Sequence, residues 1–201
     1  MYYDHEIWPH IDVNDLWIFD KSILSRKLGF KCGPAGVPVP KPGNYIVRPC
    51  VNLEGMGKGA SIKHIKDSSW DIVPAGYFWQ ELFTGRHISV DFEYQKQIRA
   101  TEGFRKSKNL MMFDRWIVVD YEPSIPDFVH EIIKKYPFVN VELVDNKIIE
   151  IHLRRNPDFS DGCTEIIPVW EGKKIKHPEG FIFVPDITDE RPRLGFYKRY
   201  F

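Results

Sequence analysis

The chain of 201 residues is long enough for one compact body with a sizeable core, built as a single domain or as two lobes. Its 28 Lys and Arg residues balance 28 Asp and Glu residues at an isoelectric point of about 7.1, which argues against a protein held mainly by nucleic acid or anionic lipid. Hydrophobic residues make up 43% of the chain and aromatic residues 14%, a composition that excludes a wholly disordered protein.

Residues 1–19 are predicted to form a short aromatic arm that packs on the body of the protein. The arm mixes tryptophan and phenylalanine with acidic residues, and its sequence indicates no function. A short helix follows, because Asp20 can cap a first turn and Gly29 can end a last one. Apolar residues recur at helical spacing between these two positions, at Ile23, Leu24 and Leu28.

The next stretch is predicted to be loop and strand. Residues 31–44 contain four Pro and three Gly, which predicts an irregular or extended connection. A strand is expected at 45–48 and a short β-like run at 61–65. The loop between these two strands has glycine at alternate positions, namely Gly55, Gly57 and Gly59. This spacing indicates a flexible loop with an accessible backbone.

The middle of the chain is predicted to alternate strands with one helix. Residues 77–83 are strongly β-like, and residues 87–93 place apolar side chains on one side of a second strand. The segment 95–109 is basic and lacks a periodic pattern, which favours a solvated loop. Residues 116–121 read as a strand, and the helical pattern at 124–136 stops before a proline.

A hairpin over residues 139–155 carries the strongest pattern in the chain. A three-residue turn at 145–147 would put an apolar set on one face: Val139, Val141, Leu143, Ile149, Ile151 and Leu153. The other face would carry Asn140, Glu142, Glu150, His152 and Arg154. Glu142 and Glu150 would then lie opposite each other and repel unless something neutralises them. Either this pair binds a hard divalent cation or the face is simply solvated.

Arg48 ends a predicted strand next to Pro49 and stands shortly before the glycine loop. A fixed guanidinium beside exposed backbone N–H groups is the arrangement that a polyphosphate needs. The spacing matches neither the GxGxxG nor the P-loop pattern, so an ordinary glycine loop is the competing interpretation.

In their order along the chain, these pieces resemble the ATP-grasp superfamily of nucleotide-dependent ligases from residue 20 to about residue 156. The resemblance lies in a strand that ends in Arg before Pro, a glycine-rich flap, a hinge strand that leads into GRHISV, and a last hairpin that ends EIHLR. The phosphate segment looks most like the carbamoyl-phosphate synthetase branch. The resemblance implies an α+β fold with two lobes of mainly antiparallel sheet, a lid lobe at 20–83 and a larger lobe at 84–201, and nucleotide in the cleft between them.

The resemblance also implies roles for individual residues. Its nucleotide-binding positions are Lys21, Arg48, Gly55, Gly57, Gly59, Glu81, Leu82, Phe83 and His87. Among these, Arg48 would hold the α- and β-phosphates, the hinge would meet the adenine and His87 the ribose. The implied metal ligands are Glu142, Glu150 and His152. Arg154 would face the transferred phosphoryl group, which makes Arg48 and Arg154 the implied catalytic residues.

Three features depart from the family pattern. His152 stands where the third metal ligand is usually Asn, and imidazole suits manganese better than magnesium, so Asn140 or Asn156 is an alternative ligand. The stretch at 66–76 is too short for the helix that the family keeps there, which implies a trimmed lid. Only nineteen residues precede Asp20, so the N-terminal substrate domain of the family is expected to be missing.

The implied function is an ATP- and metal-dependent ligase that activates a carboxylate as an acylphosphate for attack by an amine or a similar nucleophile. ATP and Mg²⁺, with Mn²⁺ as the alternative, are the implied cofactors, and the acceptor is expected to be macromolecular or presented by a partner protein. The competing hypotheses are a catalytically degenerate nucleotide-binding protein and a nucleic-acid-associated protein. The last would use the interleaved basic and aromatic residues at 191–201, which read equally well as an edge strand.

The sequence favours a cytoplasmic protein without membrane association. Its three cysteines form no CxxC pair and read as reduced thiols. Acidic groups stand among the first ten residues, where a signal peptide would be basic and then apolar. No apolar run approaches the roughly 18 residues of a membrane span.

Overall fold

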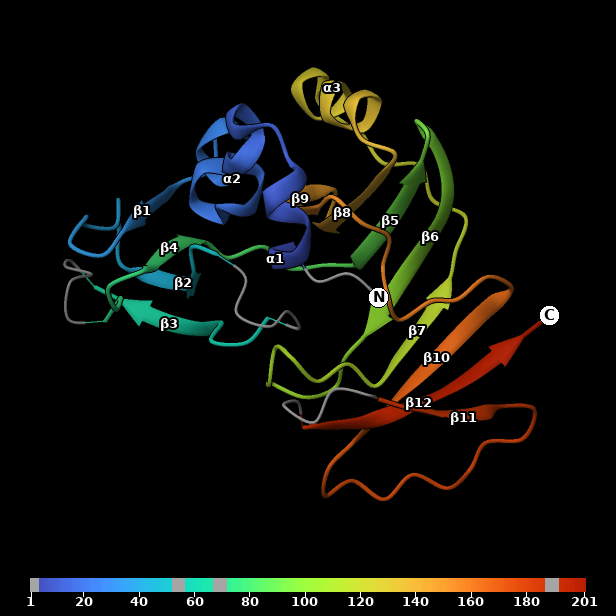
Figure 1. Cartoon of the computed structure of the whole chain (residues 1–201). Coiled ribbons are helices and arrows are strands. Elements are labelled where there is room, and N and C mark those ends of the chain that lie inside the picture. The colour runs from blue at the N-terminus through green and yellow to red at the C-terminus, as the bar shows by residue number, and fades with distance from the viewer. Residues whose placement is uncertain (1–3, 52–56, 67–71, 187–191) are drawn as a thin grey trace.

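The computed structural model describes residues 4–51, 57–66, 72–186 and 192–201, which form two antiparallel sheets with few helices (Figure 1). The predicted α+β class with mainly antiparallel sheets is confirmed. Within these ranges, every helix is too short or too polar to traverse a bilayer. One sheet lies within residues 32–81 and the other within residues 87–200, while the division into lobes at residue 83 stays a prediction.

The first sheet has four strands in the order β1-β4-β2-β3. They are β1 (Cys32–Pro34), β2 (Gly43–Pro49), β3 (Ser61–Ile65) and β4 (Tyr77–Glu81). The prediction of a wholly irregular connection at 31–44 is wrong, because Cys32 and Gly33 pair with β4. Pro34 is tolerated there because β1 is an edge strand. A small apolar cluster on this sheet includes Tyr45 and Trp79.

The second sheet has eight strands in the order β11-β12-β10-β7-β6-β5-β8-β9. They are β5 (His87–Glu93), β6 (Lys96–Phe104), β7 (Arg115–Val118), β8 (Phe138–Val144), β9 (Lys147–His152), β10 (Cys163–Trp170), β11 (Ile182–Pro185) and β12 (Arg193–Tyr200). The basic segment at 95–109 is therefore mostly strand, because main-chain pairing with β5 and β7 needs no apolar periodicity. The end of the chain is likewise an interior strand, since β12 pairs on both sides.

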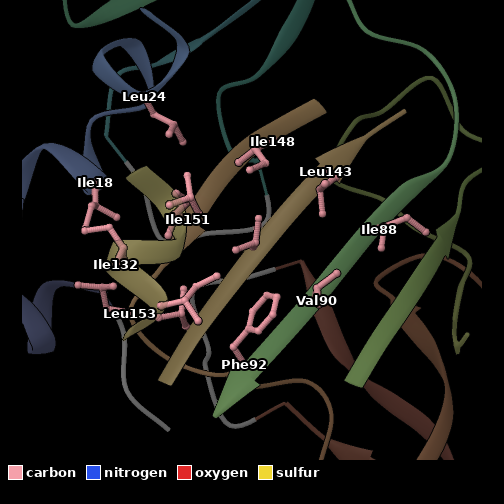
Figure 2. Close-up of a cluster of buried hydrophobic side chains, with 14 of the residues drawn as sticks. Ile18, Leu24, Ile88, Val90, Phe92, Ile132, Leu143, Ile148, Ile151 and Leu153 are labelled. Carbon is pink, nitrogen blue, oxygen red and sulfur yellow. The ribbon is translucent and has the colours of Figure 1, made fainter. Parts of the chain in front are cut away.

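The main core lies between the second sheet and three helical segments (Figure 2). These are the 3₁₀ helix η2 (Val13–Phe19), α2 (Lys21–Lys27) and α3 (Asp127–Lys135). Each buries at least one side chain against the sheet, as Ile18, Leu24 and Ile132 do. Because η2 belongs to residues 1–19, this segment contributes Ile18 and Phe19 to the core. In the described part of the segment, α1 (Asp4–Ile7) and η1 (Trp8–His10) precede η2.

The β8–β9 hairpin differs from its prediction by one residue. Asp145 and Asn146 form a two-residue turn with positive φ values of 50° and 62°, the conformation that favours Asn and Asp in tight hairpins. An irregularity in the pairing then places Ile148, and not Ile149, opposite Leu143 and in the core. The predicted opposition of Glu142 and Glu150 is confirmed.

The predicted helix after Asp20 is confirmed as α2, and Asp20 is its N-cap. Asp20 Oδ1 accepts hydrogen bonds from the backbone N–H groups of Ser22 at 2.8 Å and Ile23 at 3.0 Å. These bonds satisfy donors that have no partner inside the helix. The cap fixes the start of the helix, and therefore the place from which Lys21 extends.

Replacing Asp20 by Ala removes both capping bonds and is expected to lower the free energy of unfolding by about 1 kcal/mol. Urea unfolding measures this change. Asp120→Ala, at an exposed loop aspartate, is the matched control and should stay within roughly 0.5 kcal/mol of the native protein. Equal losses in the two variants would contradict the capping role.

Candidate functional site

A pocket of about 480 Å³ is lined by residues of both sheets. The first sheet contributes Ile46, Arg48 and Gln80, while the second contributes residues of β5, β7, β8, β9 and β10. Asp4 of α1 and Lys21 of α2 also line it. The pocket therefore lies where the resemblance places the nucleotide.

The opposed carboxylates Glu142 and Glu150 form the floor of a charged cluster in this pocket. His152 lies between them, with Nε2 at 3.7 Å from Glu142 Oε1 and 3.5 Å from Glu150 Oε1. Lys21 Nζ lies 3.2 Å from Glu150 Oε1, and His87 Nε2 lies 3.2 Å from Glu142 Oε2. Burial by itself raises the pKa of Glu142, yet the bonds from His152 and His87 hold that pKa well below its ordinary value. The repulsion between the carboxylates is thus relieved by neighbouring side chains of the chain itself.

His152 is held from its other side by Asp4, whose Oδ2 lies 2.9 Å from Nδ1 of the imidazole. Burial alone would lower the pKa of His152, and Arg154 also lowers it, but the carboxylates of Asp4 and Glu150 raise it to about 10. A protonated imidazole donates from both nitrogens and has no lone pair for a metal.

The three predicted metal ligands Glu142, Glu150 and His152 lie close together. Among the described residues, however, no group of three or more His, Cys, Asp or Glu side chains is disposed to hold a metal ion. Of the alternative ligands, Asn156 Oδ1 accepts from the backbone of Asp158 at 3.0 Å, whereas Asn140 donates through Nδ2 to Asp91 at 2.8 Å, which does not engage the amide oxygen that a metal would bind. The metal centre stays a prediction.

Arg48 is buried where β2 of the first sheet meets β9 of the second. Its Nη2 donates to Gln80 Oε1 at 2.8 Å and to the Ile149 carbonyl at 3.0 Å. Its Nε is one of two buried side-chain nitrogen or oxygen atoms in the described residues that lack a hydrogen-bond partner. Burial also lowers the pKa of the guanidinium, against the pull of Glu150 and Glu142. An unpaired buried donor on a cation favours an anionic ligand.

The three predicted hinge residues differ in their surroundings, because Glu81 bonds to Lys31 whereas Leu82 and Phe83 line the pocket. The backbone N–H of Glu81 donates to the Lys31 carbonyl, and the Glu81 side chain accepts from the Lys31 N–H at 2.9 Å, so Glu81 supports β1. The predicted contact of the Glu81 backbone with adenine stays a prediction, and its N–H is already bonded to Lys31. Leu82 and Phe83 follow the end of β4, and both line the pocket. Their contact with adenine stays a prediction.

The glycine loop is described from Gly57 onward, and Gly55 lies outside the described residues. Gly57 and Gly59 both have positive φ, at 69° and 79°. A Cβ on Gly59 would also lie 2.7 Å from the hydroxyl of Tyr77, so this position requires glycine on two grounds. Gly57 and Lys58 line the pocket, in the place where the resemblance puts a flap.

His87 lines the pocket, and its contact with the ribose stays a prediction. Its imidazole contacts Glu142 and meets the rings of Phe113 and Trp116 edge-on, at centroid distances of 5.0 and 5.4 Å. It therefore joins the carboxylate pair to an aromatic wall that the sequence analysis did not assign to the site. Trp170 also belongs to this wall, since its Nε1 donates to the Phe113 carbonyl at 2.8 Å.

No family model matches the chain, and no curated protein matches it. A solved protein of Archaeoglobus fulgidus assigned to the ATP-grasp superfamily is 17% identical at a TM-score of 0.51, with 90% of this chain and 64% of that chain covered. A carboxyaminoimidazole ribonucleotide synthase of Aspergillus clavatus, solved with ATP, is 10% identical at a TM-score of 0.53, with 92% and 69% covered. At these identities the likeness shows the fold alone, and this fold is that of the ATP-grasp proteins.

The raised pKa of His152 makes the free energy of unfolding depend on pH. Both the folded and the unfolded chain hold the proton well below pH 6.5, whereas only the folded chain holds it between 6.5 and about 10. Stability should therefore fall as pH rises through this window, by up to about 1.4 kcal/mol per pH unit. Urea unfolding at about pH 7, 8 and 9 measures the slope.

His152→Gln is the matched control, because its amide keeps hydrogen-bonding atoms but does not titrate. Its slope over the same pH range should be smaller than that of the native protein. Identical slopes in the two proteins would contradict a protonated His152 in the folded state.

Proposed function

We propose that this protein binds ATP in the pocket between its sheets and uses it to activate a carboxylate for joining to an amine or a similar nucleophile. The observation that carries the proposal is Arg48, a buried guanidinium with an unpaired Nε in a pocket of nucleotide size. The shared fold supports it, because the Aspergillus clavatus synthase was solved with ATP. The chain spans 64% of the length of the Archaeoglobus fulgidus protein, so the activity of a whole ligase is part of the proposal.

The pocket offers each part of a nucleotide a suitable surface. Ile46, Leu82 and Phe83 provide an apolar wall for a base, next to the main chain that follows β4. Arg48 provides charge for phosphates, and the turn from Gly57 provides backbone near them. These residues fit ATP, which would supply the phosphoryl group that activates the carboxylate.

The contribution of the chain to such a reaction would be positioning and charge neutralisation. Arg48 is fixed by Gln80, which Ser25 Oγ holds in turn at 2.9 Å, so the guanidinium does not have to be ordered when an anion arrives. Arg154 supplies a second cation on the hairpin beyond His152, and the proposal places it against the carboxylate that is activated. Positive charge held in place lowers the energy of negative charge as it develops.

A second candidate is a nucleotide-binding protein without catalysis. The observation that favours it is the engagement of His152 with Glu142, Glu150 and Asp4, which pairs these carboxylates with a side chain of the protein itself. The structure gives less support to the hypothesis of a nucleic-acid-associated protein. Arg193 and Lys198 of β12 are buried and bonded to Asp158, so they are not on the surface that a nucleic acid would contact. ATP that binds but yields no ADP with any carboxylate and amine tried would favour the second candidate.

Arg48→Gln is expected to weaken ATP binding by at least about tenfold, or about 1.4 kcal/mol, because it removes the charge that faces the phosphates. Calorimetric titration measures this with ATP alone, with Mg²⁺ and with Mn²⁺. Thermal unfolding of the variant shows whether it is folded.

The matched control is Arg115→Gln, since Arg115 is exposed and pairs with Glu165 at 2.6 Å outside this pocket. It should bind ATP as the native protein does. If native protein in a folded state binds no ATP under any of the three conditions, the proposed function is overturned.

A further inference from the structure

The aspartate of α1 is buried in the pocket, although several residues that follow it are exposed. Asp4 is 7% exposed, whereas Glu6, Trp8 and His10 are exposed. Its Oδ1 accepts from Arg154 Nε at 3.0 Å, while its Oδ2 contacts His152 at 2.9 Å. A carboxylate is costly to bury unless it is paired, so these two side chains account for the position of Asp4.

Arg154 and His152 together form a receptor for one carboxylate. Arg154 Nη2 approaches His152 Nδ1 to 3.5 Å, so their positive edges converge on a single position. A guanidinium and an imidazole that donate to different oxygens fix a carboxylate in a defined orientation. This position adjoins Glu142 and Glu150 in the same pocket, where the proposed function requires a carboxylate to be held.

The segment that carries Asp4 is anchored further along the chain. Asp12 and Asp15 pair with Lys135 of α3 at 2.7 and 2.6 Å, and Ile18 is part of the core. In contrast, α1 has one turn and lies between the two sheets (Figure 1). Ile7 packs against the edge of the main core and Trp8 meets the ring of Phe19 at a centroid distance of 5.6 Å, so displacement of Asp4 has to break its contacts with Arg154 and His152 and loosen these two.

We propose that Arg154 and His152 form a carboxylate-binding subsite in which Asp4 is an internal occupant, and that an external carboxylate binds there by displacing Asp4. This rests on the proposed function in one respect, namely that the external carboxylate is the one the protein activates. The ligand class is an aspartate-like carboxylate on a short aliphatic stem, because that is the group the subsite already holds. Asp4 thereby regulates access, since an occupied site lowers the apparent affinity for a competing ligand.

The test uses a blocked aspartate, N-acetyl-aspartate methylamide, as the probe. Calorimetry compares its binding to the native protein, to Asp4→Asn and to Glu6→Gln, which makes the same charge change at an exposed position of the same helix. Asp4→Asn should bind the probe at least about tenfold more tightly than the native protein does, because the internal competitor is removed. Glu6→Gln should match the native protein, and the blocked asparagine should bind to none of them.

A second measurement needs no variant and covers the case in which Asp4→Asn does not fold. Hydrogen exchange of the native protein with saturating probe should become faster at the amides of residues 5–10 and stay unchanged at residues 13–19. Equal affinity of the native protein and folded Asp4→Asn for the probe, or unchanged exchange at residues 5–10, would overturn the proposal.

ATP titration of the same three proteins separates the two proposals. ATP binding together with no gain of probe affinity in Asp4→Asn leaves the proposed function in place and removes the carboxylate subsite. The reverse result, a tighter probe without ATP binding, supports the subsite and overturns the nucleotide function.

Discussion

The opposition of two carboxylates on neighbouring strands is the constraint on which the rest of this structure depends. Glu142 and Glu150 face each other across the β8–β9 ladder in a largely buried position, so each requires positive charge nearby. Lys21 supplies that charge from a distant segment, α2. His152 supplies it from the hairpin itself. His152 then requires Asp4, which brings α1 into the pocket. The helical N-terminal segments are thus tied to the sheet by charge as well as by apolar packing.

The irregular pairing in the same hairpin connects the two sheets. Because Ile148 takes the place opposite Leu143, Ile149 is left without a partner in the ladder. Its carbonyl accepts from Arg48 of the first sheet. A regular hairpin would commit that carbonyl to its own ladder, whereas the extra residue releases it to a neighbour. The guanidinium that we assign to phosphates is therefore oriented by the irregularity that the sequence analysis did not anticipate.

How far the sequence predicts this molecule depends on the range of the interaction. The α2 helix follows from a cap and a spacing within ten residues, and the opposition of Glu142 and Glu150 follows from alternation about a nearby turn. The length of that turn could not be predicted from the sequence. A three-residue turn places Ile149 in the core, whereas a two-residue turn with an extra residue in β9 places Ile148 there, and the rest of the pattern is the same. The contact of Asp4 with Arg154 joins residues 150 positions apart and leaves no local pattern. The sequence indicates many of the residues that line the pocket, but not how they pair inside it.

Charge balance links the two ligands that we propose for the pocket. Lys21, His152 and Arg154 carry three positive charges in the cluster, and Asp4, Glu142 and Glu150 carry three negative ones. Arg48 adds a fourth positive charge, on which Glu150 and Glu142 act. Asp4 already takes the donors of Arg154 and His152, so an added carboxylate can bind those donors only in its place. Asp4 lies in a one-turn helix, whereas Glu142 and Glu150 lie within strands. Nε of Arg48 has no hydrogen-bond partner, so nucleotide phosphates can bind it without such an exchange. A phosphate can therefore enter directly, whereas a carboxylate enters by replacement.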